Sequence, residues 1–157
     1  MASEAWDILN AFKDILGANS EVSNILHSND HIYIFDDEIT IVEEKKTYPF
    51  INLDIDVRET VNADNHRRYD YERHQYKILV SFAVREKTKQ KAKISIWEFA
   101  EAIESAYAGS KSLRNNVKIV SSPADIVTDA LRVQDENFWM GRGFMFIDVY
   151  KDICLRT

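Results

Sequence analysis

Glycine, proline and cysteine are scarce in this chain of 157 residues. No set of the four glycines, at positions 17, 109, 141 and 143, has the spacing of a phosphate-binding loop or a dinucleotide fingerprint. The single cysteine, Cys154, cannot form an intramolecular disulfide, so nothing indicates an oxidising compartment. The sequence contains no GxSxG, HExxH or paired-cysteine motif, which are common signatures of serine hydrolases, zinc proteases and zinc ribbons. We therefore expect no cofactor and no bound metal.

Long apolar runs and a surplus of basic residues are also missing. No segment approaches about eighteen apolar residues in a row, and residues 1–12 carry Glu4 and Asp7 in place of the basic start of a signal peptide. We expect a soluble, cytoplasmic protein that does not bind membranes. The net charge of −6 argues against general affinity for nucleic acid, which needs an excess of Lys and Arg.

The charges are unevenly distributed along the chain. Residues 1–64 hold four basic and fourteen acidic side chains, residues 65–93 hold nine and three, and residues 94–157 hold seven and nine. The resulting net charges of −10, +6 and −2 predict an acidic side and a basic side on the folded molecule.

The composition, with 45% hydrophobic and 29% charged residues, is typical of a globular domain, which we expect to span residues 1–157. Ser3 is placed to cap a first helix, whose apolar residues recur at spacings of three and four until Gly17. Residues 20–26 are expected to add another turn or two of helix.

A central helix is predicted from Ile96 to Ala108, between the capping Ser95 and Gly109. Ser95 and Glu98 form a capping box in front of an apolar stripe, and the basic residues 85–93 are interpreted as the connection that precedes the helix.

Alternating apolar and polar residues predict the strands. Ile51, Leu53, Ile55 and Val57 should share one buried face, and a matching strand at 76–84 completes a long hairpin with a solvated tip. Shorter strands are predicted at 32–35 and 39–42, a plausible hairpin, and at 117–120 and 138–150; in the last of these, Gly141 and Gly143 indicate a bulge or a close approach to another backbone. Residues 122–128 fit either a helix start or a strand.

The order of these elements predicts an α+β fold. We expect a mixed, mainly antiparallel sheet with a long hairpin, packed against the N-terminal helix and the central helix.

Two patterns could support metal chemistry. Asp37 (or Asp36), Glu43 and Lys45 have the spacing by which some nucleases place a carboxylate pair beside a lysine, but a solvated turn followed by a charged strand end is the preferred interpretation. A row of possible metal ligands also falls on one face of an extended strand, interrupted by Arg68, and an exposed hairpin arm is the preferred interpretation. The row comprises His66, Asp70, Glu72 and His74.

A basic run follows the second long strand. Its side chains could contact phosphate, with Tyr69, Tyr71 and Trp97 stacking on bases, but the acidic net charge opposes this function. The preferred interpretation is a solvated connection or the basic half of a contact with an acidic neighbour. The run comprises Lys87, Lys89, Lys91 and Lys93.

The order of elements resembles that of the tail terminator, or tail completion, proteins of long-tailed bacteriophages. The resemblance covers residues 4–152 and includes the strand entered by Tyr48, Pro49 and Phe50 and the aromatic final strand that ends at 147–150. This family shares shape and length instead of a signature peptide, so no functional residue is transferred from it. The long excursion at 58–75 departs from the pattern and would also suit another neck component.

The resemblance implies a structural protein and not an enzyme. Six copies would form a ring on the tail tube, stop tube polymerisation and create the surface for head docking. The implied partners are further copies of the chain, the tube protein and a head connector protein, with DNA only as passing cargo. The protein would occupy the host cytoplasm during assembly and then the virion tail.

We expect the hairpin arm 58–74 and the basic connection 87–93 to lie at subunit or tube contacts, since an acidic and a basic surface suit head-to-tail packing. A head-to-tail neck or connector protein and, in a different class, the metal-dependent nuclease remain the alternatives. The interface residues we select are Arg67, Arg68, Arg73, Lys87, Lys89 and Lys91.

Overall fold

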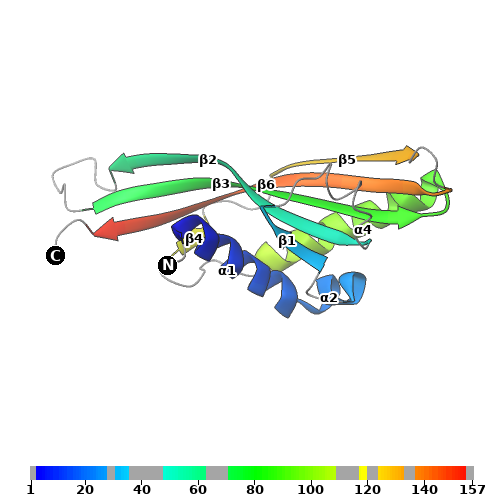
Figure 1. Cartoon of the computed structure of the whole chain (residues 1–157), viewed down its shortest axis with the longest axis horizontal. Coiled ribbons are helices and arrows are strands. Elements are labelled where there is room, and N and C mark those ends of the chain that lie inside the picture. The colour runs from blue at the N-terminus through cyan, green and yellow to red at the C-terminus, as the bar shows by residue number, and fades with distance from the viewer. Residues whose placement is uncertain are drawn as a thin grey trace.

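The structure is a computed structural model that describes residues 3–27, 31–35, 48–62, 71–108, 117–119, 124–132 and 137–154. Within these ranges helices lie on one face of a long, twisted sheet (Figure 1). The helices are α1 (Glu4–Ala18), α2 (Ser20–Leu26) and α4 (Lys89–Ala108). The strands are β1 (Ile32–Ile34), β2 (Phe50–Asn62), β3 (Tyr71–Glu86), β4 (Val117–Ile119), β5 (Ala124–Arg132) and β6 (Trp139–Cys154).

The sheet has the strand order β1-β2-β3-β6-β4, and β5 also pairs with β6. Only the β1–β2 pair is parallel among these pairings; the others are antiparallel. The predicted α+β class is therefore confirmed, with its mixed, mainly antiparallel sheet, long hairpin and two packed helices.

Strands β2, β3 and β6 form a three-stranded ribbon that runs the length of the molecule (Figure 1). The described parts of the hairpin arm expected at 58–74 are regular sheet, because β2 and β3 stay paired as far as Asn62 and Glu72. Its tip, and the hairpin partner expected at 39–42, lie outside the described residues.

A β-bulge in β2 corrects one prediction. Ile51, Leu53 and Ile55 pair with core residues of β3, but the register shifts between Ile55 and Val57. One extra residue reverses the alternation, so Val57 pairs with Lys77 and is 45% exposed on the other face.

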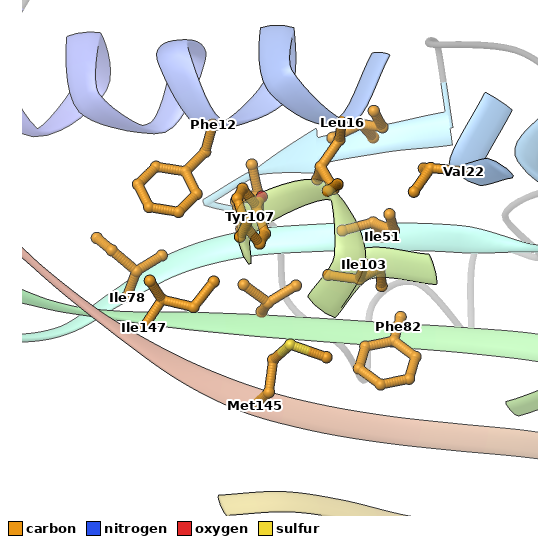
Figure 2. Close-up of a cluster of buried hydrophobic side chains, with 14 of the residues drawn as sticks. Phe12, Leu16, Val22, Ile51, Ile78, Phe82, Ile103, Tyr107, Met145 and Ile147 are labelled. Carbon is orange, nitrogen blue, oxygen red and sulfur yellow. The ribbon is translucent and has the colours of Figure 1, made fainter. Parts of the chain in front are cut away.

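The main core lies between the helices and the sheet (Figure 2). Phe12 of α1 packs on Tyr107 of α4, with ring centroids 4.8 Å apart, above Ile78 and Ile147 of the sheet. The apolar stripe of α1 supplies this core as predicted, and the Ser3 hydroxyl accepts a hydrogen bond from the Trp6 N–H. Asn19 ends α1 and caps α2 through its side-chain oxygen, which accepts from Val22 N–H.

The central helix begins seven residues earlier than expected, at Lys89 instead of Ile96. Thr88 caps it: its hydroxyl accepts from Lys91 N–H and its carbonyl from Ala92 N–H. The predicted capping box at Ser95 is wrong, because Ser95 is already inside the helix and its hydroxyl donates to Glu86. The basic residues 89–93 therefore belong to the helix.

The structure decides between the helix start and the strand that the sequence allowed in the region 122–128. Residues 124–132 form strand β5, so their β-branched side chains prevailed over the helix-start signals. A Cβ at Gly141 would lie 2.6 Å from the carbonyl oxygen of Ala92 in α4, which confirms the close backbone approach expected there. The short strand predicted near 117 is β4. None of the described helices is long and apolar enough to cross a membrane.

Candidate assembly surfaces

Arg73 lies on β3 near one end of the ribbon and is held by side chains of β6. Its guanidinium donates two hydrogen bonds to Asp152, at 2.8 and 3.2 Å, and lies 4.0 Å from the centroid of the Tyr150 ring. The hydrogen bond to Asp152 raises the pKa of Arg73. This arginine therefore stabilises the ribbon and presents a neutralised pair at the surface.

The three predicted interface lysines lie at the other end of β3. Lys87 is in the turn after β3, and Lys89 and Lys91 are in the first turn of α4; all are exposed. The Lys89 ammonium lies 5.8 Å from the centroid of the Trp139 ring. We therefore expect the ammonium groups of Lys87 and Lys91 to extend further from the sheet than that of Lys89.

The basic residues described within 71–93 do not gather on one side of the molecule. Fourteen residues of nearly continuous strand separate Arg73 from Lys87, which corresponds to about 45 Å. Arg67 and Arg68 lie outside the described residues. The predicted set therefore contributes to two separate ends, and the prediction of a single basic side is corrected.

A polar cluster that the sequence did not reveal joins the start of α1 to the ribbon. The His74 Nδ1 lies 2.7 Å from Glu4 Oε2, and Tyr76 donates its hydroxyl hydrogen to the same carboxylate. Lys151 Nζ lies 3.7 Å from Glu4 Oε1, and Arg58 lies 3.1 Å from His74 Nε2. His74 and Tyr76 follow Glu4 by 70 and 72 residues and Lys151 lies further along the chain, so no local pattern could have revealed this cluster.

Two pKa values in this cluster are shifted. Burial raises the pKa of Glu4, but the hydrogen bonds from Tyr76 and His74 and the nearby positive charges outweigh burial and lower it overall. Burial, together with the adjacent Glu4 carboxylate, raises the pKa of Tyr76. Glu4 is therefore an anion and Tyr76 a neutral donor at neutral pH.

The structure brings together only part of the row of possible metal ligands. Glu72 and His74 share a face of β3, and His74 Nε2 lies 3.2 Å from Glu72 Oε1. His66 and Asp70 lie outside the described residues. Arg58 and Lys151 place positive charge beside the pair, which disfavours a cation. Within the described ranges, no group of three or more His, Cys, Asp or Glu side chains is arranged to hold a metal ion.

The other chemical hypotheses are not supported by a shared site. Asp36, Asp37, Glu43 and Lys45 lie outside the described residues, as does Tyr69. Tyr71 is the first residue of β3 and Trp97 lies in α4, which begins after the other end of β3.

A shallow hollow of about 310 Å³ lies on the helix-free face of the ribbon. Lys77 occupies this region with its ammonium 4.6 Å from the centroid of the Phe146 ring. Three carboxylates and one lysine line the hollow, so its net charge is negative. Its lining residues are Asp56, Val57, Glu59, Gln75, Lys77 and Asp148.

The helical layer also exposes large apolar side chains. Trp6 and Phe35 are 43% and 47% exposed, and Ile94 and Trp97 of α4 are 51% and 45% exposed. Trp6, Ile94 and Trp97 each lie outside the buried apolar stripe of their helix. Their exposure could therefore be predicted from the sequence once the helix bounds are known.

Comparisons with known proteins show a likeness in fold. No family model matches the chain, and no curated protein matches it. Among solved structures, a chain from the virion of a native gene transfer agent particle has a similar fold, with a TM-score of 0.54 and 12% sequence identity. The alignment covers 96% of this chain and 100% of that chain. The likeness therefore extends over the complete fold of both proteins.

Proposed function

We propose that this chain is a structural protein of a virion, and that copies of it close into a ring at the end of a tail tube. The observation that carries the proposal is the end-to-end likeness in fold to a chain of a virion particle. The order of its elements, which resembles tail terminator proteins, supports the finer assignment. At 12% identity the likeness concerns the fold, so the ring and its position are our inference.

In this role the protein acts by contact instead of catalysis. The ring, of six copies by analogy with tail terminators, stops addition of tube subunits and offers its free side to a head connector protein. DNA passes through the lumen, and the net charge of −6 disfavours retention of phosphate there. The protein then acts in the host cytoplasm during assembly and remains in the tail of the virion.

Charge reversal at one end of the molecule tests the proposal. Lys87→Glu, Lys89→Glu and Lys91→Glu together replace three exposed positive charges, and we expect the variant to remain a folded monomer while the wild-type chain forms the ring. Sedimentation velocity gives the mass, and circular dichroism gives the fold. An oligomer of unchanged mass would exclude these lysines from the subunit contact.

A further inference from the structure

An exposed aromatic pair lies beside the N-terminal helix; we call it the α1 patch and define it as Trp6 and Phe35. The two rings stack with centroids 6.3 Å apart and an interplanar angle of 27°. Phe35 has a φ of 58°, in the left-handed region that bulky side chains rarely adopt. Its N–H donates to the carbonyl oxygen of Leu53, 2.9 Å away. The backbone is thus anchored in an unfavourable conformation that leaves a phenylalanine ring on the surface.

A second exposed pair lies on α4; we call it the α4 patch and define it as Ile94 and Trp97. The two residues are one turn apart, on the side of the helix away from the buried Ile96, Phe99 and Ile103. Roughly half of each side chain is accessible. A tryptophan beside an aliphatic side chain on an outer helix face is typical of the central residues of protein interfaces.

The charged residues before the two patches differ in sign. Residues 3–27, which contain Trp6, hold four acidic residues and one lysine. Residues 86–93, which lead into Ile94, hold four lysines and one glutamate. On α4, Lys91 and Lys93 lie one turn before Ile94 and Trp97, and Glu98 and Glu101 lie one turn after them. The basic N-terminal edge of the α4 patch is the part that complements Asp7 beside Trp6.

The positions of the helices keep the two patches apart. Helix α1 packs over β1 and β2, whereas α4 packs over β3, β5 and β6. The α1 patch and the α4 patch therefore belong to opposite sides of the helical layer, counted across the strands. A contact between two different patches on different copies is heterologous, and repeated around an axis it closes a ring.

We propose that the α4 patch of one copy packs against the α1 patch of the next copy. The inference rests on the proposed function, since it names the two surfaces by which copies of the chain would form the ring. The chain itself presents both halves of the contact, apolar centre against apolar centre and basic neighbours against acidic ones. Nucleic acid would suit the α4 patch only, and the acidic residues beside Trp6 would repel it.

Variants that disable one patch at a time test the pairing. The first variant carries Trp6→Ala and Phe35→Ala, and the second carries Ile94→Ala and Trp97→Ala. All four side chains are well exposed, so both variants should fold like the wild-type chain. Native mass spectrometry should show each variant alone as a monomer. An equimolar mixture should give a dimer with one copy of each, because one intact α1 patch and one intact α4 patch remain, and this dimer cannot grow further.

A matched control removes exposed apolar area elsewhere. Val127→Ala with Phe144→Ala truncates two side chains on the helix-free face, which are 48% and 38% exposed, and should leave the wild-type mass unchanged. If both patch variants keep the wild-type oligomer, or their mixture gives no mixed dimer, the pairing is overturned while the ring stands. If the wild-type chain is monomeric at every concentration, the ring and the pairing fail together.

Discussion

Glu4 ties the first turn of α1 to two strands through His74, Tyr76 and Lys151. Its folded-state pKa lies below the ordinary value of 4.5. A group with a lowered folded-state pKa adds stability above its unfolded pKa, and that stability is lost as the pH falls through the folded value.

We therefore expect Glu4→Gln to lower the free energy of unfolding at neutral pH, and the difference from wild type to shrink below about pH 4.5. Urea unfolding at several pH values measures this difference. Glu21→Gln, which changes an exposed carboxylate of α2, serves as the control. A difference that stays constant down to about pH 3 would show that the Glu4 charge does not contribute.

Tyr107 carries a fully buried hydroxyl for which the described residues provide no hydrogen-bond partner. Burial raises the pKa of this group well above its ordinary value. Because an unsatisfied buried hydroxyl is unfavourable, Tyr107→Phe should stabilise the protein by about 1 kcal/mol while it keeps the ring contact with Phe12.

Tyr76→Phe is the matched comparison, since that hydroxyl donates to Glu4, and its loss should destabilise the protein by about 1–3 kcal/mol. Thermal and urea unfolding of both variants give the two values. A larger loss at Tyr107 than at Tyr76 would mean that the Tyr107 hydroxyl has a partner.

The start of α4 is a clear case in which a local signal misled. Ser95 and Glu98 have the spacing of a capping box, but Thr88 provides the cap, because the helix needs its additional turns to place Ala92 and Ile96 against the sheet. We expect Thr88→Ala to cost about 1 kcal/mol of stability and Ser95→Ala to cost less, since alanine suits a helix interior. Urea unfolding measures the free energy of unfolding of both variants. A greater loss for Ser95→Ala than for Thr88→Ala would favour the predicted helix start capped by Ser95.

Strand β6 and helix α4 touch where Gly141 leaves room for the Ala92 carbonyl group. A Cβ at this position would lie 2.6 Å from that oxygen and 2.9 Å from a methyl group of Val84. Gly141→Ala should therefore destabilise the protein by about 1–3 kcal/mol, as in other overpacked cores. Calorimetric unfolding tests this, and a change below about 0.5 kcal/mol would mean that the helix moves away freely.

Periodicity predicted most elements and the fold class, because α1, β3 and β6 each present one apolar face to a common core. It failed where a single residue changed the register, as at the β2 bulge, and it left β5 undecided, where helix-start signals and β-branched residues overlap. The site predictions were less complete. The lysines were identified as a group, but their separation from Arg73 depends on strand length, and the Trp6–Phe35 contact depends on how α1 packs beside β1.

The described part of the protein is a long ribbon with helices on one face. Arg73 and Asp152 form an ion pair near one end of the ribbon, and three exposed lysines lie at the other end. Exposed aromatic side chains lie on both sides of the helical layer. Such asymmetry favours contacts between unlike surfaces of identical copies. The described residues include two exposed apolar patches, the α1 patch with Asp7 beside it and the α4 patch with a basic N-terminal edge, and these are the surfaces by which we propose that copies assemble.

The oligomeric mass of the 157-residue chain in solution shows whether the protein forms a closed ring or remains a monomer. Native mass spectrometry over a range of concentrations should give a single closed species whose mass is a whole multiple of 18.3 kDa, and six copies is the number that the tail terminator resemblance implies. A species of 18.3 kDa at every concentration, or an open series of masses without a dominant member, would contradict the ring.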